Sequence, residues 1–307
     1  MKHGRSRRKR NLHALWFLLP ALIVYTTFMI APIITSMVQS LYTFDANRTL
    51  SFVWFQNYKT LLTDAAWSGS LWNALWNSAK FFLINMFIQN PLALFLAVLL
   101  AGKTRCGNAY RTILYLPCIL SLVMVAFVWQ MMLNPTWGIV RDMLQAVGLG
   151  SLFQPWLGQK QTALTTMSLI SAWQNLGVPV LLYYSALISI PGELIEASRV
   201  DGCTKARTFW RIKLPMVMPM VATVSLLTYI YNFNAFDLIY AIKGPMAGPD
   251  FSTDTMMSFF FRTFYGHQLQ QPNAPMGATV ACVILMLMLG GVLLYLAANK
   301  AANKRIN

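Results

Sequence analysis

The chain has 307 residues, of which 57 % are hydrophobic and only 11 % are charged. Soluble domains carry about 25 % charged residues, so this composition excludes an ordinary soluble protein and indicates a membrane protein. The net charge is +15, but the basic residues gather at the ends of apolar segments, so we expect no nucleic acid partner. Four cysteines without C-x-x-C spacing and only three histidines predict neither a disulfide framework nor a metal site.

Six apolar stretches are long enough to cross a bilayer, which takes about 20 residues each. We place them near residues 12–40, 77–101, 112–133, 163–190, 216–242 and 276–298. The first stretch is longer than the apolar core of a signal peptide, about 7–15 residues, and no clear A-x-A cleavage site follows it. We therefore expect a membrane anchor there, and an all-α membrane protein with six transmembrane helices.

The distribution of Lys and Arg predicts how these helices are oriented, because short cytoplasmic loops retain an excess of both residues. Most of the 24 Lys and Arg residues lie in the N-terminal tail, the loops after the second and fourth spans, and the C-terminal tail. All four segments fall on one side of the membrane. We therefore expect both termini in the cytoplasm, with a basic tail over 1–11, a six-span domain over 12–298 and a second tail over 299–307.

The three outer segments have different characters. Residues 41–76 are rich in Trp, which favours the membrane–water interface. Residues 134–162 carry apolar side chains at helical spacing, which predicts a short amphipathic helix on the outer surface. These side chains are Ile139, Val140, Met143, Leu144 and Val147. Residues 243–275 are rich in Gly and Pro, so we expect them to be irregular.

The cytoplasmic loop over residues 191–215 is the most informative stretch. Pro191 suits the first position of a helix, and the acidic Glu193 and Glu196 complement the positive end of the helix dipole. Asp201-Gly202 supplies a turn, since glycine adopts positive φ without strain. A basic amphipathic segment then leads into the fifth span. The pattern predicts a compact helix–turn–helix, a shape suited to docking on a soluble partner.

The run E-A-S-R-V-D-G, followed nine residues later by I-K-L-P, resembles the EAA loop of binding-protein-dependent ABC importer permeases. The residues that match this pattern are Glu196, Ala197, Gly202, Ile212, Leu214 and Pro215. Ser198 and Cys203 stand where alanine is frequent, which keeps these side chains small. In the family this loop holds the coupling helix, which inserts into a cleft of the ATPase subunit. The resemblance implies the same role here, for Glu193, Ser198 and Asp201 as well as for the matching residues.

Three further runs resemble the carbohydrate branch of these permeases, which includes maltose and glycerol-phosphate types. They are F-V-W-F-Q-N-Y (52–58), where Trp54 replaces the usual glycine, N-P-T-W-G-I-V-R-D-M-L (134–144) and F-N-A-F-D-L-I-Y (233–240). The resemblance implies a type I ABC importer permease fold in a bacterial or archaeal plasma membrane. It also implies four partners: a second homologous permease, an ABC ATPase dimer that holds ATP and Mg, an extracytoplasmic solute-binding protein, and a sugar. We expect no catalytic residue and no cofactor on this chain.

Polar side chains inside spans are costly in lipid and usually face a bundle interior or a pathway. Two groups are candidates for a substrate pathway, because aromatic rings suit the C–H faces of sugars and amides suit their hydroxyls. They are Trp173, Gln174 and Asn175 in the fourth span, and Tyr229, Asn232, Phe233 and Phe236 in the fifth. The second group recurs at i, i+3, i+4 and i+7, which predicts one helical face. Hydrogen bonding between helices explains the same residues equally well.

Other functions fit the sequence less well. Residues 97–104, A-V-L-L-A-G-K-T, nearly match a phosphate-binding loop, but an apolar span precedes them where a β-strand is required. A secondary transporter often shows inverted repeats, and we detect none. A membrane-embedded enzyme requires clustered His, Asp or Glu near the membrane, and the sequence lacks such clusters. The sequence does not decide among a sugar, glycerol phosphate and another polyol.

Overall fold

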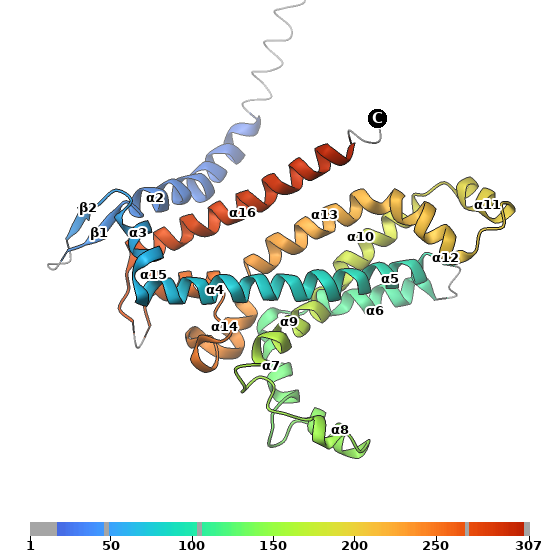
Figure 1. Cartoon of the computed structure of the whole chain (residues 1–307), viewed down its shortest axis with the longest axis horizontal. Helices are drawn as coiled ribbons and strands as arrows, with labels where there is room; N and C mark the ends of the chain where they lie inside the picture. The colour runs from blue at the N-terminus through green and yellow to red at the C-terminus, as the bar shows by residue number, and fades with distance from the viewer. Residues whose placement is uncertain (1–16, 46–48, 103–105, 268–269, 304–307) are drawn as a thin grey trace, which may run out of the picture.

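The computed structural model describes residues 17–45, 49–102, 106–267 and 270–303. The predicted basic tail over 1–11 and the end of the C-terminal tail lie outside this part. The structure is helical apart from one small hairpin (Figure 1). The helices are α2 (Ala31–Gln39), α3 (Gln56–Thr63), α4 (Ala65–Ile84), α5 (Asn90–Leu100), α6 (Gly107–Ile119), α7 (Leu122–Met132), α8 (Ile139–Ala146), α9 (Ala163–Gln174), α10 (Gly177–Ile188), α11 (Gly192–Val200), α12 (Lys205–Thr208), α13 (Leu214–Phe233), α14 (Asp237–Lys243), α15 (Met256–Tyr265) and α16 (Ala274–Asn303).

Four described helices are long and apolar enough to cross a membrane: Phe17–Gln39, Ala65–Leu100, Lys205–Met246 and Ala274–Lys300. Two further candidates are bent pairs, α6 with α7 at 94° and α10 with α11 at 69°. Counting each pair as one span gives six, although α11 lies in the predicted 191–215 loop and not in the predicted fourth span. The fourth predicted span is not one helix, because α9 and α10 are separated by a break at residues 175–176.

Three of the long helices contain a π-helical turn, and each turn lies just before a proline. The turns are Thr26–Ile30, Asn85–Gln89 and Phe209–Lys213, and the prolines are Pro32, Pro91 and Pro215. A proline has no backbone N–H and its ring crowds the carbonyl four residues earlier, so the preceding turn widens. The helices continue through these positions without a break, which lets the prolines lie within spans.

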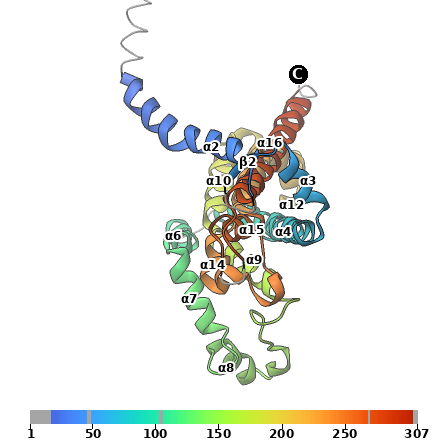
Figure 2. The same ribbon diagram turned by 90° about the vertical axis from the view of Figure 1, so that its left-hand side faces the viewer.

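The continuous helix α4–α5 is the scaffold of the bundle. Its Phe81 packs into one core cluster with α7, α9 and α14. Ala93 and Ala97 pack into a second cluster with α10 and α13. Leu71 and Ala74 pack into a third with α15 and α16. Figure 1 shows this helix running the length of the molecule, with α11 and α12 near one end and the hairpin and α15 at the other. The arm formed by α7 and α8 projects away from the bundle (Figure 2).

The first outer segment is more ordered than a simple loop. It forms strands β1 (Tyr42–Phe44) and β2 (Leu50–Phe52), paired antiparallel, then α3 and the first turns of α4. The second membrane helix therefore begins at Ala65, twelve residues before the predicted start of the span. The amide Nδ2 of buried Asn57 donates to the carbonyls of Ser40 at 2.8 Å and Tyr42 at 2.6 Å, which fixes the base of the hairpin.

Trp54 follows the hairpin in the position where the carbohydrate branch usually has glycine. Its φ is +52°, in the left-handed region that strains a residue with a side chain. A glycine adopts this conformation without a penalty, which explains the usual residue. Here the indole stacks edge-on against Phe52, with ring centroids 4.8 Å apart, and remains two-thirds exposed.

The third outer segment was expected to be irregular, and this prediction is wrong for much of its length. It contains the ten-residue helix α15, and the chain before that helix is held by polar side chains of α4. Nδ2 of Asn73 donates to the carbonyl of Phe251 at 2.9 Å, and Nδ2 of Asn77 donates to that of Asp254 at 3.0 Å. The glycines and prolines are in the connecting turns, while the ordered part depends on contacts distant in sequence.

A buried salt bridge lies beside these contacts. Nη2 of Arg262 donates to Oδ2 of Asp254 at 2.7 Å, and both side chains are almost completely buried. The guanidinium also lies over the ring of Phe251, 4.4 Å from its centroid. The pair lies between the fifth and sixth spans. Burial raises the pKa of Asp254 to about 6, although the Arg262 guanidinium acts in the opposite direction.

Candidate functional site

The loop between α10 and α13 has the predicted helix–turn–helix form. Helix α11 ends in a Schellman motif, in which the N–H of Cys203 donates to the carbonyl of Ser198 at 2.9 Å and that of Gly202 to Arg199 at 3.0 Å. Gly202 has φ +71°, and a Cβ added there meets nothing within 4 Å. The turn therefore requires glycine for its backbone conformation and points into open space.

Two small residues of the motif have opposite environments. Ala197 is exposed, as are Glu193, Glu196 and Asp201. Ser198 is buried, and its Oγ lies 3.2 Å from Oγ1 of Thr208 on α12. The resemblance implies a place for Ser198 on the docking surface, but its buried side chain instead closes the contact between the two short helices. Pro191 also differs from its predicted place, because it is the N-cap and α11 begins at Gly192.

The loop carries exposed apolar side chains that the sequence analysis did not single out. Val200 is 88 % exposed, Trp210 66 % and Leu194 44 %. A short amphipathic surface helix normally turns its apolar residues toward the protein, but these lie outward beside the acidic residues of α11. Exposed apolar groups close to charges are typical of a surface that is covered by a partner.

The second half of the motif joins the loop to the bundle. Leu214 packs against the cluster of α5, α10 and α13, and Ile195 of α11 contacts the same cluster. Ile212 is half-buried within the π-helical turn Phe209–Lys213, and Pro215 follows in the first turn of α13. The chain is helical from Lys205 into α13, so no break separates the end of the loop from the fifth span.

One cavity of about 470 Å³ lies between α10 and α13, with Gln89 of the α4–α5 helix beside it. Asn175 and Asn232, two of the candidate pathway residues, line it together with Tyr231. Nδ2 of Asn175 donates to the Tyr231 hydroxyl at 3.1 Å. The Oδ1 of Asn232 is buried and has no hydrogen-bond partner among the described residues.

Tyr229 and Phe233 have packing roles instead. Their rings contact each other and Phe82, with centroid distances between 4.6 and 6.1 Å. The Tyr229 hydroxyl donates to the carbonyl of Leu287 on α16 at 2.6 Å. Phe236 does not share their face, and that prediction is wrong, because α13 ends at Phe233 and the chain turns before α14.

Phe236 instead stacks on two rings beyond the break. Its centroid lies 5.1 Å from that of Tyr240 and 4.9 Å from that of Phe261. Asn234, Ala235 and Phe236 are non-helical. Periodicity alone gives no sign of this interruption, because the residues remain apolar or amide-bearing across it.

A second cavity of about 720 Å³ lies between α7, α8 and α9. Trp173 of α9 and Trp129 of α7 stand edge-on, with centroids 5.6 Å apart, and Trp156 lines the same cavity. The hydroxyls of Thr162, Thr165 and Thr166 belong to the lining as well. Sequence analysis identified Trp173 but missed Trp129, because only the 94° bend between α6 and α7 places this indole opposite α9.

Gln174 supports that bend and lines neither cavity. Its side-chain Nε2 donates to the carbonyl of Leu120, between α6 and α7, at 3.1 Å. Its backbone carbonyl accepts from Sγ of Cys118 at 3.0 Å. The proline Pro117 lies inside α6 just before the bend. The Gln174 side chain therefore satisfies one backbone carbonyl at the bend. No group of three or more His, Cys, Asp or Glu in the described ranges could hold a metal ion.

The comparisons with known proteins agree with this architecture. The family model of the binding-protein-dependent transport system inner membrane component matches residues 89–306. This chain belongs to that family. As a member it is a multi-pass membrane transport subunit and not an enzyme.

Relatives and solved structures match nearly the whole chain. A probable ABC transporter permease protein, YurN of Bacillus subtilis, is 29 % identical over 278 residues, which are 89 % of this chain and 92 % of YurN. The lactose transport system permease protein LacF of Rhizobium radiobacter is 28 % identical over 288 residues, 93 % of this chain and 94 % of LacF. A chain of the bacterial alginate ABC transporter, solved in complex with an alginate pentasaccharide-bound periplasmic protein, has a TM-score of 0.81 at 21 % identity, with 96 % of both chains covered.

Proposed function

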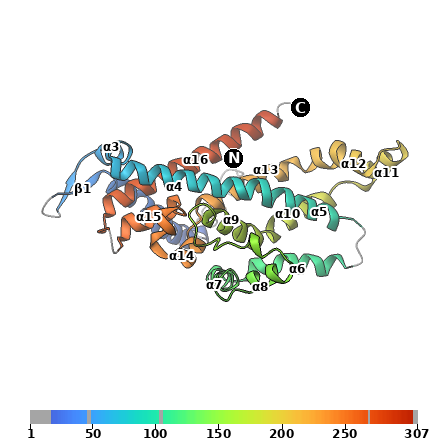
Figure 3. The same ribbon diagram turned by 60° about the horizontal axis from the view of Figure 1, so that its bottom comes forward.

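We propose that this chain is one of two membrane-spanning subunits of an ATP-driven importer, and that it forms half of the pathway for a sugar delivered by an extracytoplasmic binding protein. The observation that carries the proposal is the loop over 191–215. The glycine of its turn, Gly202, has no side chain, and the outer surface of the loop combines acidic and apolar groups. The loop lies at one end of the bundle (Figure 3). A surface of this kind fits a cleft on a soluble ATPase.

The loop residues have coupling roles in this proposal. Glu193, Glu196, Ala197 and Asp201 face the ATPase, and Gly202 allows its close approach. Ser198 keeps α11 against α12. ATP and Mg are held by the ATPase dimer, whose closure draws the docked loops of this subunit and a second homologous permease together. The movement passes into α13 through the continuous helix, and access to the pathway alternates between the two sides of the membrane.

The sugar assignment rests on relatives and on the cavities. LacF is named for lactose and the solved transporter for alginate, both carbohydrates. Asn175 and Asn232 supply amides in one cavity, and Trp173 supplies an aromatic surface in the other. Both termini lie in the cytoplasm in this assignment, because it places the basic loop ends on the ATPase side.

Photo-crosslinking tests the docking role. A crosslinking amino acid replaces exposed Glu196 in α11 or, as a control, exposed Trp137 next to α8. Irradiation of cells that express the whole transporter is expected to join the Glu196 variant to a chain with a P-loop ATPase sequence. The Trp137 variant should not capture this chain. Equal capture at both positions, or no ATPase at either, would contradict the proposal.

A further inference from the structure

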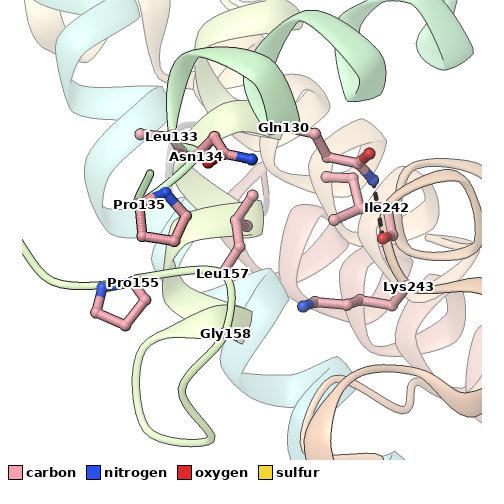
Figure 4. Close-up of a pocket in the computed structure, with 9 residues that line it drawn as sticks. All are labelled: Gln130, Leu133, Asn134, Pro135, Pro155, Leu157, Gly158, Ile242 and Lys243. Carbon is pink, nitrogen blue, oxygen red and sulfur yellow. Dashed lines mark hydrogen bonds between the residues drawn. The ribbon is translucent and has the colours of Figure 1, made fainter. Parts of the chain in front are cut away.

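A cleft of about 270 Å³ lies where three segments meet: the end of α7, the 155–158 turn and the end of α14. Its apolar walls are Leu133, Pro135, Pro155, Leu157 and Ile242. Figure 4 shows the side chain of Lys243 extending across this cleft from the end of α14 toward Leu157 and Gly158. An ammonium group therefore occupies a cleft whose walls are otherwise largely apolar.

Lys243 is half-buried and has no carboxylate partner in the part of the chain that the structure describes. The salt bridges found there join Lys160 to Asp250 and Arg262 to Asp254. Withdrawing a charge from water is costly unless another group compensates it. A lysine at the end of a span usually extends to the membrane surface, whereas the side chain of Lys243 lies across the cleft.

The other two polar side chains of the cleft, Gln130 and Asn134, form hydrogen bonds with backbone groups. Nε2 of Gln130 donates to the carbonyl of Ile242 at 2.8 Å, which ties α14 to α7 and holds the end of the helix that bears Lys243. Oδ1 of Asn134 accepts from the N–H of Thr136 at 2.8 Å. This bond turns Nδ2 of Asn134 away from the 136–137 backbone, and Figure 4 shows the amide at the rim of the cleft. The cleft is therefore lined by one cation, the ammonium of Lys243, and one amide donor, Nδ2 of Asn134.

The cleft adjoins the tryptophan-lined cavity, because Leu133 lines both. An oligosaccharide with one ring against Trp129 and Trp173 therefore lies beside the cleft that holds Lys243. A single ammonium balances the single charge of a carboxylate. A phosphate monoester carries about −1.5 to −2 on one group and would keep an uncompensated charge in the cleft, whereas each carboxylate of an acidic oligosaccharide carries a single charge.

We propose that the cleft binds the carboxylate of an acidic sugar whose ring lies against Trp129 and Trp173. The inference rests on the proposed transport of sugars and gives the substrate class: oligosaccharides that contain uronic acid. Lys243 is the residue that distinguishes these from neutral sugars, and Gln130 is a positioning residue that acts through the end of α14.

The test measures binding directly, so that it does not depend on the binding protein. The permease is purified with its associated subunits and placed in nanodiscs of phosphatidylcholine. Trigalacturonate and neutral galactotriose are titrated, and binding is followed by tryptophan fluorescence. The variants are Lys243→Met, Lys243→Arg, and Lys160→Met as a control for loss of an exposed ammonium.

The wild type is expected to prefer trigalacturonate, and Lys243→Met should lower the affinity ratio of trigalacturonate to galactotriose at least about tenfold, or about 1.4 kcal/mol. Lys243→Arg and Lys160→Met should keep the ratio. An equal loss for both sugars in Lys243→Met would show a packing role, and an unchanged ratio would show no contact with the carboxylate. Either result overturns the inference.

Two further comparisons distinguish a lipid from a sugar as the source of the anion, and an acidic sugar from a neutral one. If phosphatidylglycerol in the nanodiscs removes the preference as fully as Lys243→Met does, the anion is a lipid phosphate and the inference fails. If the wild type binds galactotriose but not trigalacturonate, the proposal of a sugar importer stands and only the acidic class is wrong. If the wild type binds neither sugar, both the sugar assignment and the inference are wrong.

Discussion

Gly202 offers the sharpest perturbation of the proposed docking surface. Its φ of +71° costs a residue with a side chain about 1–2 kcal/mol, and Asn and Asp tolerate this region best. A Cβ at this position meets no atom within 4 Å, so no clash adds to that cost. We therefore expect Gly202→Asp to lower the free energy of unfolding of the permease by no more than about 2 kcal/mol.

The effect on coupling should be much larger. The new carboxylate enters the space that the ATPase fills, and an unpaired buried charge costs about 3–5 kcal/mol. This corresponds to a loss of at least about a hundredfold in the docking equilibrium, since each 1.4 kcal/mol is tenfold. Gly202→Asn has the same shape without the charge, so we expect it to keep part of the docking. Gly148→Asp is the matched control, with φ +75°, the same open space and a position in the outer segment.

The assay has three readouts: the amount of permease in the membrane, the amount of ATPase that co-purifies with it, and substrate uptake. Gly202→Asp should reach the membrane in normal amounts, retain little ATPase and show no uptake. Gly148→Asp should retain the ATPase. Normal ATPase retention and uptake in Gly202→Asp would refute the reasoning, as would equal loss of the ATPase in both glycine variants.

Two further predictions concern the packing that supports the site. Gly291→Ala should destabilise the permease in thermal unfolding by about 1–3 kcal/mol, because its Cβ would lie 2.3 Å from the ring of Tyr229. The adjacent Gly290→Ala has open space and should change little, so equal melting of the two variants would contradict this contact. Arg262→Met should cost about 3–5 kcal/mol at pH 7.5, since it leaves the carboxylate of Asp254 buried without its partner. The cost should shrink at pH 5.5, because burial raises the pKa of Asp254, the substitution removes the guanidinium that lowers it, and protonation removes the charge. A pH-independent cost would exclude this cause.

Features that depend on local chemistry could be predicted from the sequence. The left-handed turn at Gly202 follows from an Asp-Gly pair between two helical patterns, and the structure has it. The amphipathic pattern after Gly138 predicted α8, which forms at Ile139–Ala146. Apolar length predicted the four long spans, although their ends moved wherever helices continue beyond the apolar stretch, as α4 does from Ala65.

Features that depend on contacts between distant segments could not be predicted. Helix α15 is ordered because Asn73 and Asn77 bind the chain before it, more than 170 residues away in sequence. The break after Phe233 has no composition signal, and it changed the neighbours of Phe236. The cleft around Lys243 requires the bend between α6 and α7, which brings α7 against α14, so no local pattern reveals it.

The central claim is that this chain works as a subunit of an ATP-driven importer, and the composition of its complex tests that claim most directly. Tagged protein is purified from native membranes in mild detergent, and the chains that accompany it are identified by mass spectrometry. We expect a P-loop ATPase and a second permease with an EAA loop in stable association with this chain. Recovery of this chain alone, folded and still able to transport after reconstitution, would contradict the claim and indicate a secondary transporter.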